Sequence, residues 1–66
     1  MERKELISSR EYWATTLALS LWNNDGGNEA NYEYWEKVAE KIVDDDFMKK
    51  IIELIDLKYK THPVGA

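Results

Sequence analysis

Three stretches of the chain place apolar residues at the spacing of an amphipathic helix. In the first, Trp13, Leu17 and Leu21 follow one another at intervals of four residues. The second and third stretches repeat this spacing from Tyr32 and from Phe47. At about 100° per residue, such positions share one face of a helix. The pattern predicts helices over about residues 8–23, 29–43 and 46–60, followed by a tail over residues 61–66.

The residues around the first predicted helix are typical of helix ends. The order Ser-Ser-Arg-Glu at its start resembles a capping box, which begins the helix at Ser8 and lets Glu11 reach back to the open end. The Gly-Gly pair at 26–27 follows the last periodic residue, where glycine commonly stops a helix. Asn28 or Asn31 is then expected to cap the second helix.

The fold class that follows is all-α, a small three-helix bundle forming one domain over residues 1–66. The hydrophobic core of a 66-residue chain supplies only a few kcal/mol of net stability. The chain has no cysteine for a disulfide, but three Trp and four Tyr can pack densely. Tyr12 and Leu19 fall outside the main apolar arc and need cover from the N-terminal segment or from another chain. We therefore expect a homo-oligomer, with an interlocked homodimer as one form of the bundle.

Charge narrows the classes of partner. The net charge is −4, and residues 11–46 hold nine acidic residues against two lysines. This balance opposes direct nucleic-acid binding, which needs a basic footprint, and favours a protein partner with a basic surface. No apolar run approaches the ~20 residues that cross a bilayer, so no membrane partner is expected. The first residues lack the order of a signal peptide, which predicts a cytoplasmic location.

The acidic residues of the second predicted helix form its polar face. Glu33 and Lys37 are spaced for a favourable ion pair, whereas Glu36 and Glu40 are like charges one turn apart. That small cost without structural gain hints that the acidic face has a use. Trp and Tyr are enriched in binding hot spots, and one of each lies at the edge of an apolar arc. The predicted partner-binding residues are Trp22, Glu29, Glu33, Tyr34, Glu36, Glu40, Asp44, Asp45 and Asp46.

Metal binding and catalysis find little support in the sequence. The loop over residues 23–29 has the composition of a calcium loop, but its first and last ligand positions fall on Leu21 and Tyr32. The three aspartates at 44–46 are adjacent and point in different directions, which favours capping of the third helix over Mg²⁺ binding. His62 lies in the predicted tail, and no nucleophile and base share a cleft. We expect no metal, no cofactor and no enzymatic activity.

The first two predicted helices and the turn between them resemble a group of small, uncharacterised acidic proteins of phages and plasmids. The shared pattern is E-x-W, then L-W, a polar N-D-x-G turn, and Y-x-Y-W. The resemblance implies an origin in a mobile element. By analogy, a small acidic phage protein acts by occupying the basic surface of a host machine. The residues that fit the pattern are Glu11, Trp13, Leu21, Trp22, Asn24, Asp25, Gly27, Tyr32, Trp35 and Ala39.

Three functions remain open at this point. The first is an interaction protein that binds and inhibits a host complex for defence or nucleic-acid handling through its acidic helix face. The second is a sequestrator that encloses a small molecule, such as a nucleotide signal, at an aromatic-lined dimer interface. An anionic ligand would require Lys49, Lys50, Lys58 or Arg10 to converge on that pocket. The third is a structural oligomer without any other ligand.

Overall fold

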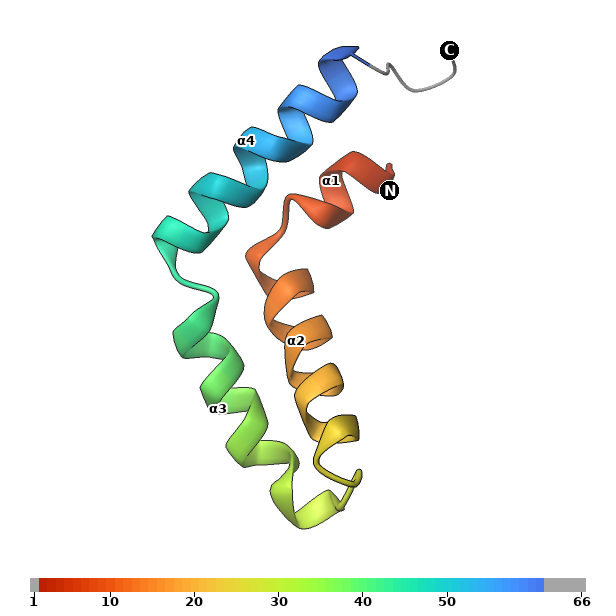
Figure 1. Cartoon of the computed structure of the whole chain (residues 1–66), viewed down its shortest axis with the longest axis vertical. Helices are drawn as coiled ribbons and strands as arrows, with labels where there is room; N and C mark the ends of the chain where they lie inside the picture. The colour runs from red at the N-terminus through yellow and green to blue at the C-terminus, as the bar shows by residue number, and fades with distance from the viewer. Residues whose placement is uncertain (1, 62–66) are drawn as a thin grey trace.

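The chain is all-α in the part that the structure describes, as the periodicity predicted. The structure is a computed structural model that describes residues 2–61, and these contain no strand. The predicted helices correspond to α2, to η1 with α3, and to α4, whereas α1 was not predicted. Most of the predicted tail lies outside the described residues. The elements in chain order are α1 (Arg3–Ile7), α2 (Arg10–Asn24), the 3₁₀-helix η1 (Glu29–Asn31), α3 (Tyr32–Ile42) and α4 (Asp45–Thr61) (Figure 1).

Two consecutive serines separate α1 from α2. The Ser8 hydroxyl donates a hydrogen bond of 2.7 Å to the Lys4 carbonyl and so completes the C-terminal end of α1. The Ser9 hydroxyl accepts a hydrogen bond of 3.4 Å from the backbone N–H of Tyr12 and caps α2. The predicted capping box is therefore displaced by one residue. This shift leaves Glu11 without a capping role.

Substitution of the two serines tests whether α2 begins after Ser9 or after Ser8. We expect Ser9→Ala to lower the free energy of unfolding by about 1 kcal/mol, because an N-cap oxygen is lost from α2. Ser8→Ala is expected to cost less, because it removes one bond at the end of a five-residue helix. Urea unfolding followed by circular dichroism measures both values. A larger loss for Ser8→Ala than for Ser9→Ala would restore the helix start predicted from the sequence.

Two glycines end α2 and form the turn after it, as predicted. Gly26 and Gly27 have positive φ angles of 96° and 68°, which favour glycine. The Gly27 N–H donates to the Trp22 carbonyl at 2.9 Å, and the Gly26 N–H donates to the Asn23 carbonyl at 3.2 Å. This pair of bonds is a Schellman motif. It ends α2 and reverses the chain, so that α3 returns antiparallel to α2 (Figure 1).

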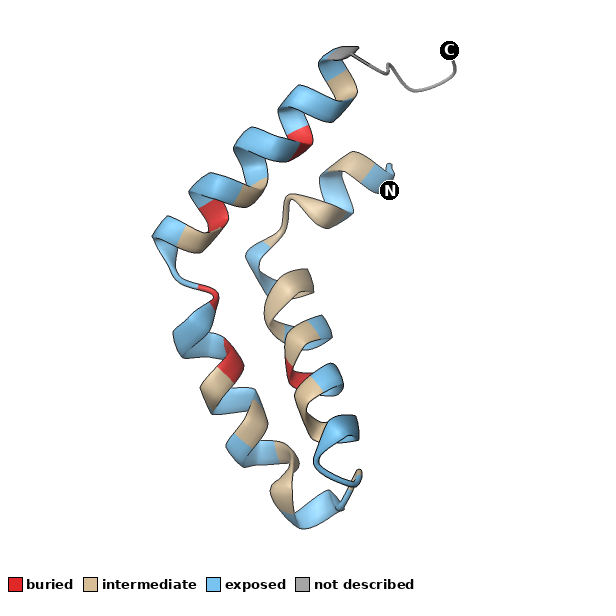
Figure 2. Cartoon of the chain, viewed as in Figure 1, coloured by how far each residue is buried: buried red, intermediate tan, exposed pale blue. Residues whose placement is uncertain are grey.

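Small residues bring α2 and α3 close together. Ala18 of α2 and Ala39 of α3 are fully buried, and so is Val43 just after α3. Alanine at facing positions allows two helix backbones to approach closely. Among the described residues, the other buried side chains are Met48 and Ile55 of α4, so the core is a narrow seam that does not reach the turn between α2 and α3 (Figure 2).

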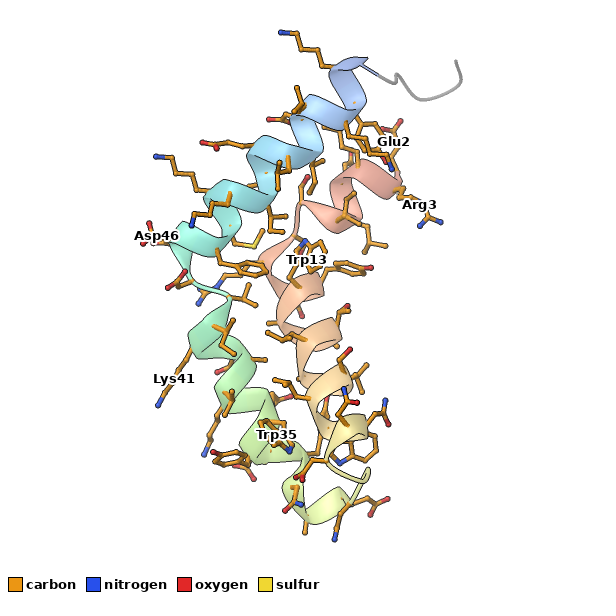
Figure 3. The ribbon with its side chains drawn as sticks, in the orientation of Figure 1. Glu2, Arg3, Trp13, Trp35, Lys41 and Asp46 are labelled. Carbon is orange, nitrogen blue, oxygen red and sulfur yellow. The ribbon has the colours of Figure 1, made fainter. Side chains whose placement is uncertain are left out.

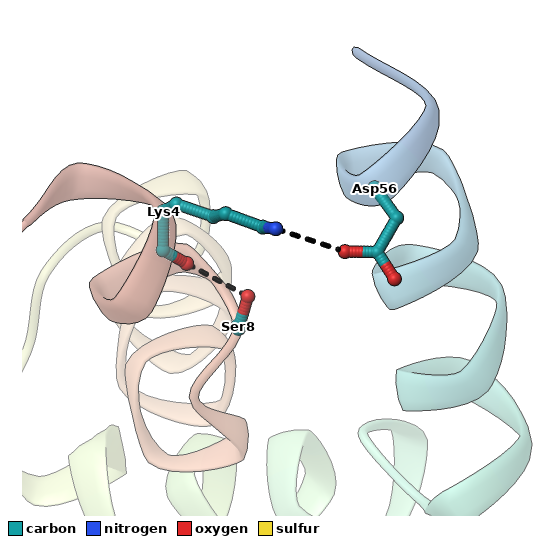
Figure 4. Close-up of polar contacts among 3 residues, drawn as sticks. All are labelled: Lys4, Ser8 and Asp56. Atoms are coloured by element: carbon teal, nitrogen blue, oxygen red, sulfur yellow. Dashed lines mark hydrogen bonds and ion pairs between the residues drawn. The ribbon is translucent and has the colours of Figure 1, made fainter. Parts of the chain in front are cut away.

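The seam changes partners at the start of α4. Beyond Val43, α4 continues away from the α2–α3 hairpin and packs against α1 (Figure 1). Lys4 of α1 and Asp56 of α4 form an ion pair of 3.3 Å, and Lys4 also supplies the carbonyl that binds Ser8 (Figure 4). The helices thus form a small, elongated bundle with principal extents of 44 × 24 × 19 Å. The periodicity did not predict this end-to-end arrangement of two helix pairs.

Trp13 lies where the two helix pairs meet (Figure 3). Its indole N–H donates a 2.6 Å hydrogen bond to the Ile7 carbonyl at the end of α1. Its ring makes edge contacts with Tyr12 and with Phe47 of α4, with ring centroids 5.5 and 6.2 Å away. One side chain therefore joins α1, α2 and α4. By contrast, Leu19, further along α2, stays 41% exposed.

Candidate interaction surface

The predicted acidic residues of α3 are all exposed. Glu33, Glu36 and Glu40 follow one another at intervals of three and four residues, and Glu36, three residues before the buried Ala39, lies beside the contact with α2. Glu33 forms the predicted ion pair with Lys37 at 3.4 Å, and both side chains are largely exposed, so the pair adds little stability. Within residues 2–61, no ion pair engages Glu36 or Glu40. Two carboxylates on α3 are therefore available to a partner.

The acidic surface continues beyond α3 at both ends. Glu29 is exposed in η1, next to the α2–α3 turn. Asp44 is exposed but also structural, because its Oδ1 accepts a 2.9 Å hydrogen bond from the Phe47 N–H and caps α4. Asp45 and Asp46 lie exposed in the first turn of α4, and Asp46 points away from the rest of the molecule (Figure 3). Carboxylates at this end of a helix are favoured by its dipole.

An open groove of about 580 Å³ lies between α2 and α3. Glu36 and Glu40 line it on the α3 side, and Glu11 lines it on the α2 side. The sequence did not predict Glu11 as a site residue, because the capping box accounted for it. Three carboxylates around one groove can bind a cationic side chain, such as that of lysine or arginine. The full lining is Arg10, Glu11, Ala14, Thr15, Glu36 and Glu40.

Arg10 lies in this groove, and its guanidinium group already binds backbone carbonyls of the chain itself. Its Nε donates a 2.7 Å hydrogen bond to the Val43 carbonyl, and its Nη2 donates to the Glu40 carbonyl at 3.4 Å. These carbonyls end α3, where a cation also interacts favourably with the helix dipole. Arg10 therefore holds the start of α2 against the end of α3. Its single positive charge offsets one of the three carboxylates that line the groove.

The two predicted aromatic contacts have different environments. Trp22 is half-buried: its ring stacks on Tyr32 with centroids 5.5 Å apart, and its N–H donates to the Asn28 carbonyl at 2.7 Å. Tyr34 is 63% exposed and touches Trp35 edge-on. At about 100° per residue, Tyr34 and Glu36 lie about 160° apart around α3. The structure thus places Tyr34 on a different side of α3 from the acidic groove.

Asp25 has a structural role that the sequence did not reveal. Its Oδ2 accepts hydrogen bonds from the Trp35 indole N–H at 3.0 Å and from the Asn31 side chain at 3.4 Å. Asn28, one of the two predicted caps, accepts a 2.9 Å hydrogen bond from the Ala30 N–H. The polar side chains of this loop therefore bind to the fold itself. Within the described residues, no three acidic or histidine side chains gather in a way that could hold a metal ion.

No family model, no curated protein and no solved structure matches this chain.

The predicted basic residues do not gather around one pocket in residues 2–61: Lys58 lies over the ring of Tyr59, with its Nζ 5.6 Å from the ring centroid, and the others lie elsewhere. Lys49 and Lys50 line a shallow pocket of α4 together with Asp46 and Glu53. Arg10 binds backbone carbonyls at the end of α3. His62 lies outside the described residues. No helix in residues 2–61 has the length and apolar character needed to cross a membrane. The groove between α2 and α3 differs from these surfaces because three carboxylates line it.

Proposed function

We propose that this chain is a small acidic interaction protein that binds a basic surface of another protein. The acidic surface of η1, α3 and the start of α4 makes the contact, and the groove between α2 and α3 takes a lysine or arginine side chain of the partner. The observation that supports this most is the grouping of Glu11, Glu36 and Glu40 around one groove. Complementary charge across such a contact accelerates association and selects the partner.

The resemblance to acidic phage and plasmid proteins suggests which partner to seek. In that setting the partner is a host protein whose basic surface serves defence or nucleic-acid handling, and occupation of that surface inhibits it. The protein then acts in the cytoplasm of the host cell. Self-association of the chain is a second part of the proposal, because several large apolar side chains remain exposed in a single copy.

Charge reversal tests the acidic groove. The wild-type chain, immobilised and exposed to host lysate, is expected to capture a basic partner that mass spectrometry identifies. The double variant Glu36→Lys/Glu40→Lys is expected to bind that partner at least ten times more weakly, since attraction becomes repulsion at two adjacent positions. Calorimetry or biolayer interferometry with the purified partner measures the change. The wild-type affinity should also fall steeply as salt is raised from low to physiological concentration.

The matched control carries the same change in net charge at other sites. Glu2→Lys/Glu5→Lys reverses two exposed carboxylates that do not line the groove. This control is expected to keep most of the affinity. Equal losses in the two double variants would show that only total charge matters, and unchanged binding by Glu36→Lys/Glu40→Lys would refute the proposed surface.

A further inference from the structure

The apolar side of α4 is wider than the surface that α1 covers. Met48 and Ile55 are buried, whereas Leu54 and Leu57 are 64% and 57% exposed. The two leucines are one helical turn apart and share one side of α4. Single exposed leucines are ordinary, but neighbouring ones on a helix face indicate a contact surface.

The chain is also larger than a compact monomer of its length. Its radius of gyration is 14.1 Å, whereas about 11 Å is typical of 66 residues. Its accessible surface is 5303 Å², compared with about 4,400 Å² for a compact protein of this mass. The excess is spread over an elongated molecule, and it shows that a single copy leaves more surface uncovered than a compact monomer does.

Charge along α4 indicates how two copies would pair. The helix begins with Asp45 and Asp46 and ends with Lys58 and Lys60. A parallel pair of α4 helices would bring like charges together, whereas an antiparallel pair sets the acidic end of each helix beside the basic end of the other. Glu53 would approach its own copy near the middle, and Lys50, which lines the same shallow pocket, is placed to offset that repulsion.

We propose that the face of α4 around Leu54 and Leu57 is the surface on which a second copy of this chain docks, with the two α4 helices antiparallel across a two-fold axis. Such a contact is isologous and closes at a dimer. The inference rests on the self-association proposed above and names the surface for it. It does not involve the acidic groove, although Asp45 and Asp46 at the start of α4 belong to both proposed surfaces.

A second exposed apolar area lies between α1 and α2 and fits a second copy less well. Leu6 and Tyr12 line this groove, but Glu5 and Glu11 line it too. A two-fold contact there would bring four carboxylates together without a basic residue among the lining side chains. The charge pattern therefore favours α4 as the dimer surface.

Molar mass in solution tests the proposal. The full chain is expected to be a dimer in light scattering at tens of micromolar and to dissociate on dilution. Leu54→Glu is expected to raise the dimer dissociation constant at least about 100-fold, because each interface would then bury two unpaired carboxylates. Both leucines are mostly exposed in the single copy, so helicity by circular dichroism should be retained. The matched control is Leu19→Glu, which replaces an exposed leucine of α2 and should remain a dimer.

Cysteine crosslinking tests the orientation, because the chain contains no cysteine. Asp46→Cys and Lys60→Cys chains are mixed and oxidised under mild conditions. Antiparallel α4 helices predict mainly disulfides that join one Asp46→Cys chain to one Lys60→Cys chain, whereas a parallel pair predicts disulfides between identical chains. A monomeric wild type at millimolar concentration, a dimer lost in Leu19→Glu but kept in Leu54→Glu, or a predominance of like-with-like disulfides would each overturn the proposal.

Separate variants test the acidic interaction and the dimer, so either proposal can be refuted without the other. Leu54→Glu chains that still capture the basic partner, alongside Glu36→Lys/Glu40→Lys chains that remain dimeric, would show that the two surfaces act independently, as expected. Loss of the dimer surface would leave the acidic interaction in place, and failure of the acidic interaction would leave the dimer measurements unaffected.

Discussion

Trp13→Ala is expected to lower the free energy of unfolding by about 3 kcal/mol, among the largest effects of any single truncation in this chain. The ring of Trp13 contacts Tyr12 and Phe47, and its N–H binds the Ile7 carbonyl. Its removal disconnects α1 and α4 from the hairpin at once. A domain of this size holds only a few kcal/mol, so the variant should be largely unfolded at 37 °C. Urea unfolding at one fixed protein concentration measures the loss, since self-association would add to the stability.

Two variants separate the contributions to this effect. Trp13→Phe keeps an aromatic ring but leaves the Ile7 carbonyl without its indole donor, and an intermediate loss of about 1–2 kcal/mol is expected. Tyr34→Ala truncates a ring that is 63% exposed and should change stability by less than about 0.5 kcal/mol. If Trp13→Ala cost no more than Tyr34→Ala, the junction between the helix pairs would not depend on Trp13.

Ala39→Leu is expected to lower the free energy of unfolding by about 2 kcal/mol, although leucine is a good helix former. Ala39 is fully buried in the seam between α2 and α3, as is Ala18. Three additional carbon atoms there must push the two helices apart. The groove that contains Glu11, Glu36 and Glu40 should then change shape, so binding to a basic partner should weaken as well. Thermal unfolding by circular dichroism gives the stability change, and calorimetry with the purified partner gives the change in affinity.

The control is the same substitution at an exposed alanine. Ala30 lies exposed in η1, so Ala30→Leu should shift stability by less than about 0.5 kcal/mol and leave partner binding unchanged. Equal stabilities for Ala39→Leu and Ala30→Leu would mean that α2 and α3 are not closely packed at this point.

Only part of the acidic surface could be predicted from the sequence. The polar side of α3 was predicted from the positions of Glu33, Glu36 and Glu40, because helical periodicity alone separates them from the buried side. Glu11 joins Glu36 and Glu40 only because α2 packs beside α3. Arg10 binds carbonyls at the far end of α3, thirty or more residues away in the chain. No local pattern contains that contact, so its role could not be predicted.

Features that depend on a few neighbouring residues were determined by the sequence itself. The apolar spacing predicted the helices now seen as α2, α3 and α4, and the glycines at 26–27 predicted the end of α2. An aspartate at 44–46 was expected to cap the last helix, and Asp44 does so. These outcomes rest on backbone geometry and on hydrogen bonds within one or two turns, which each segment carries with it.

Only the tertiary structure decided how the helices meet. Either Ser8 or Ser9 can cap a helix, and the choice depends on α1, which packs against α4 and is tied to α2 by the bond from Trp13 to Ile7. The apolar spacing that starts at Phe47 was visible in the sequence, but the part of α4 that stays uncovered was not. Which part of α4 is covered depends on which helix packs against it. Packing joins residues that are distant in the chain, and the periodicity of one helix does not specify its neighbour.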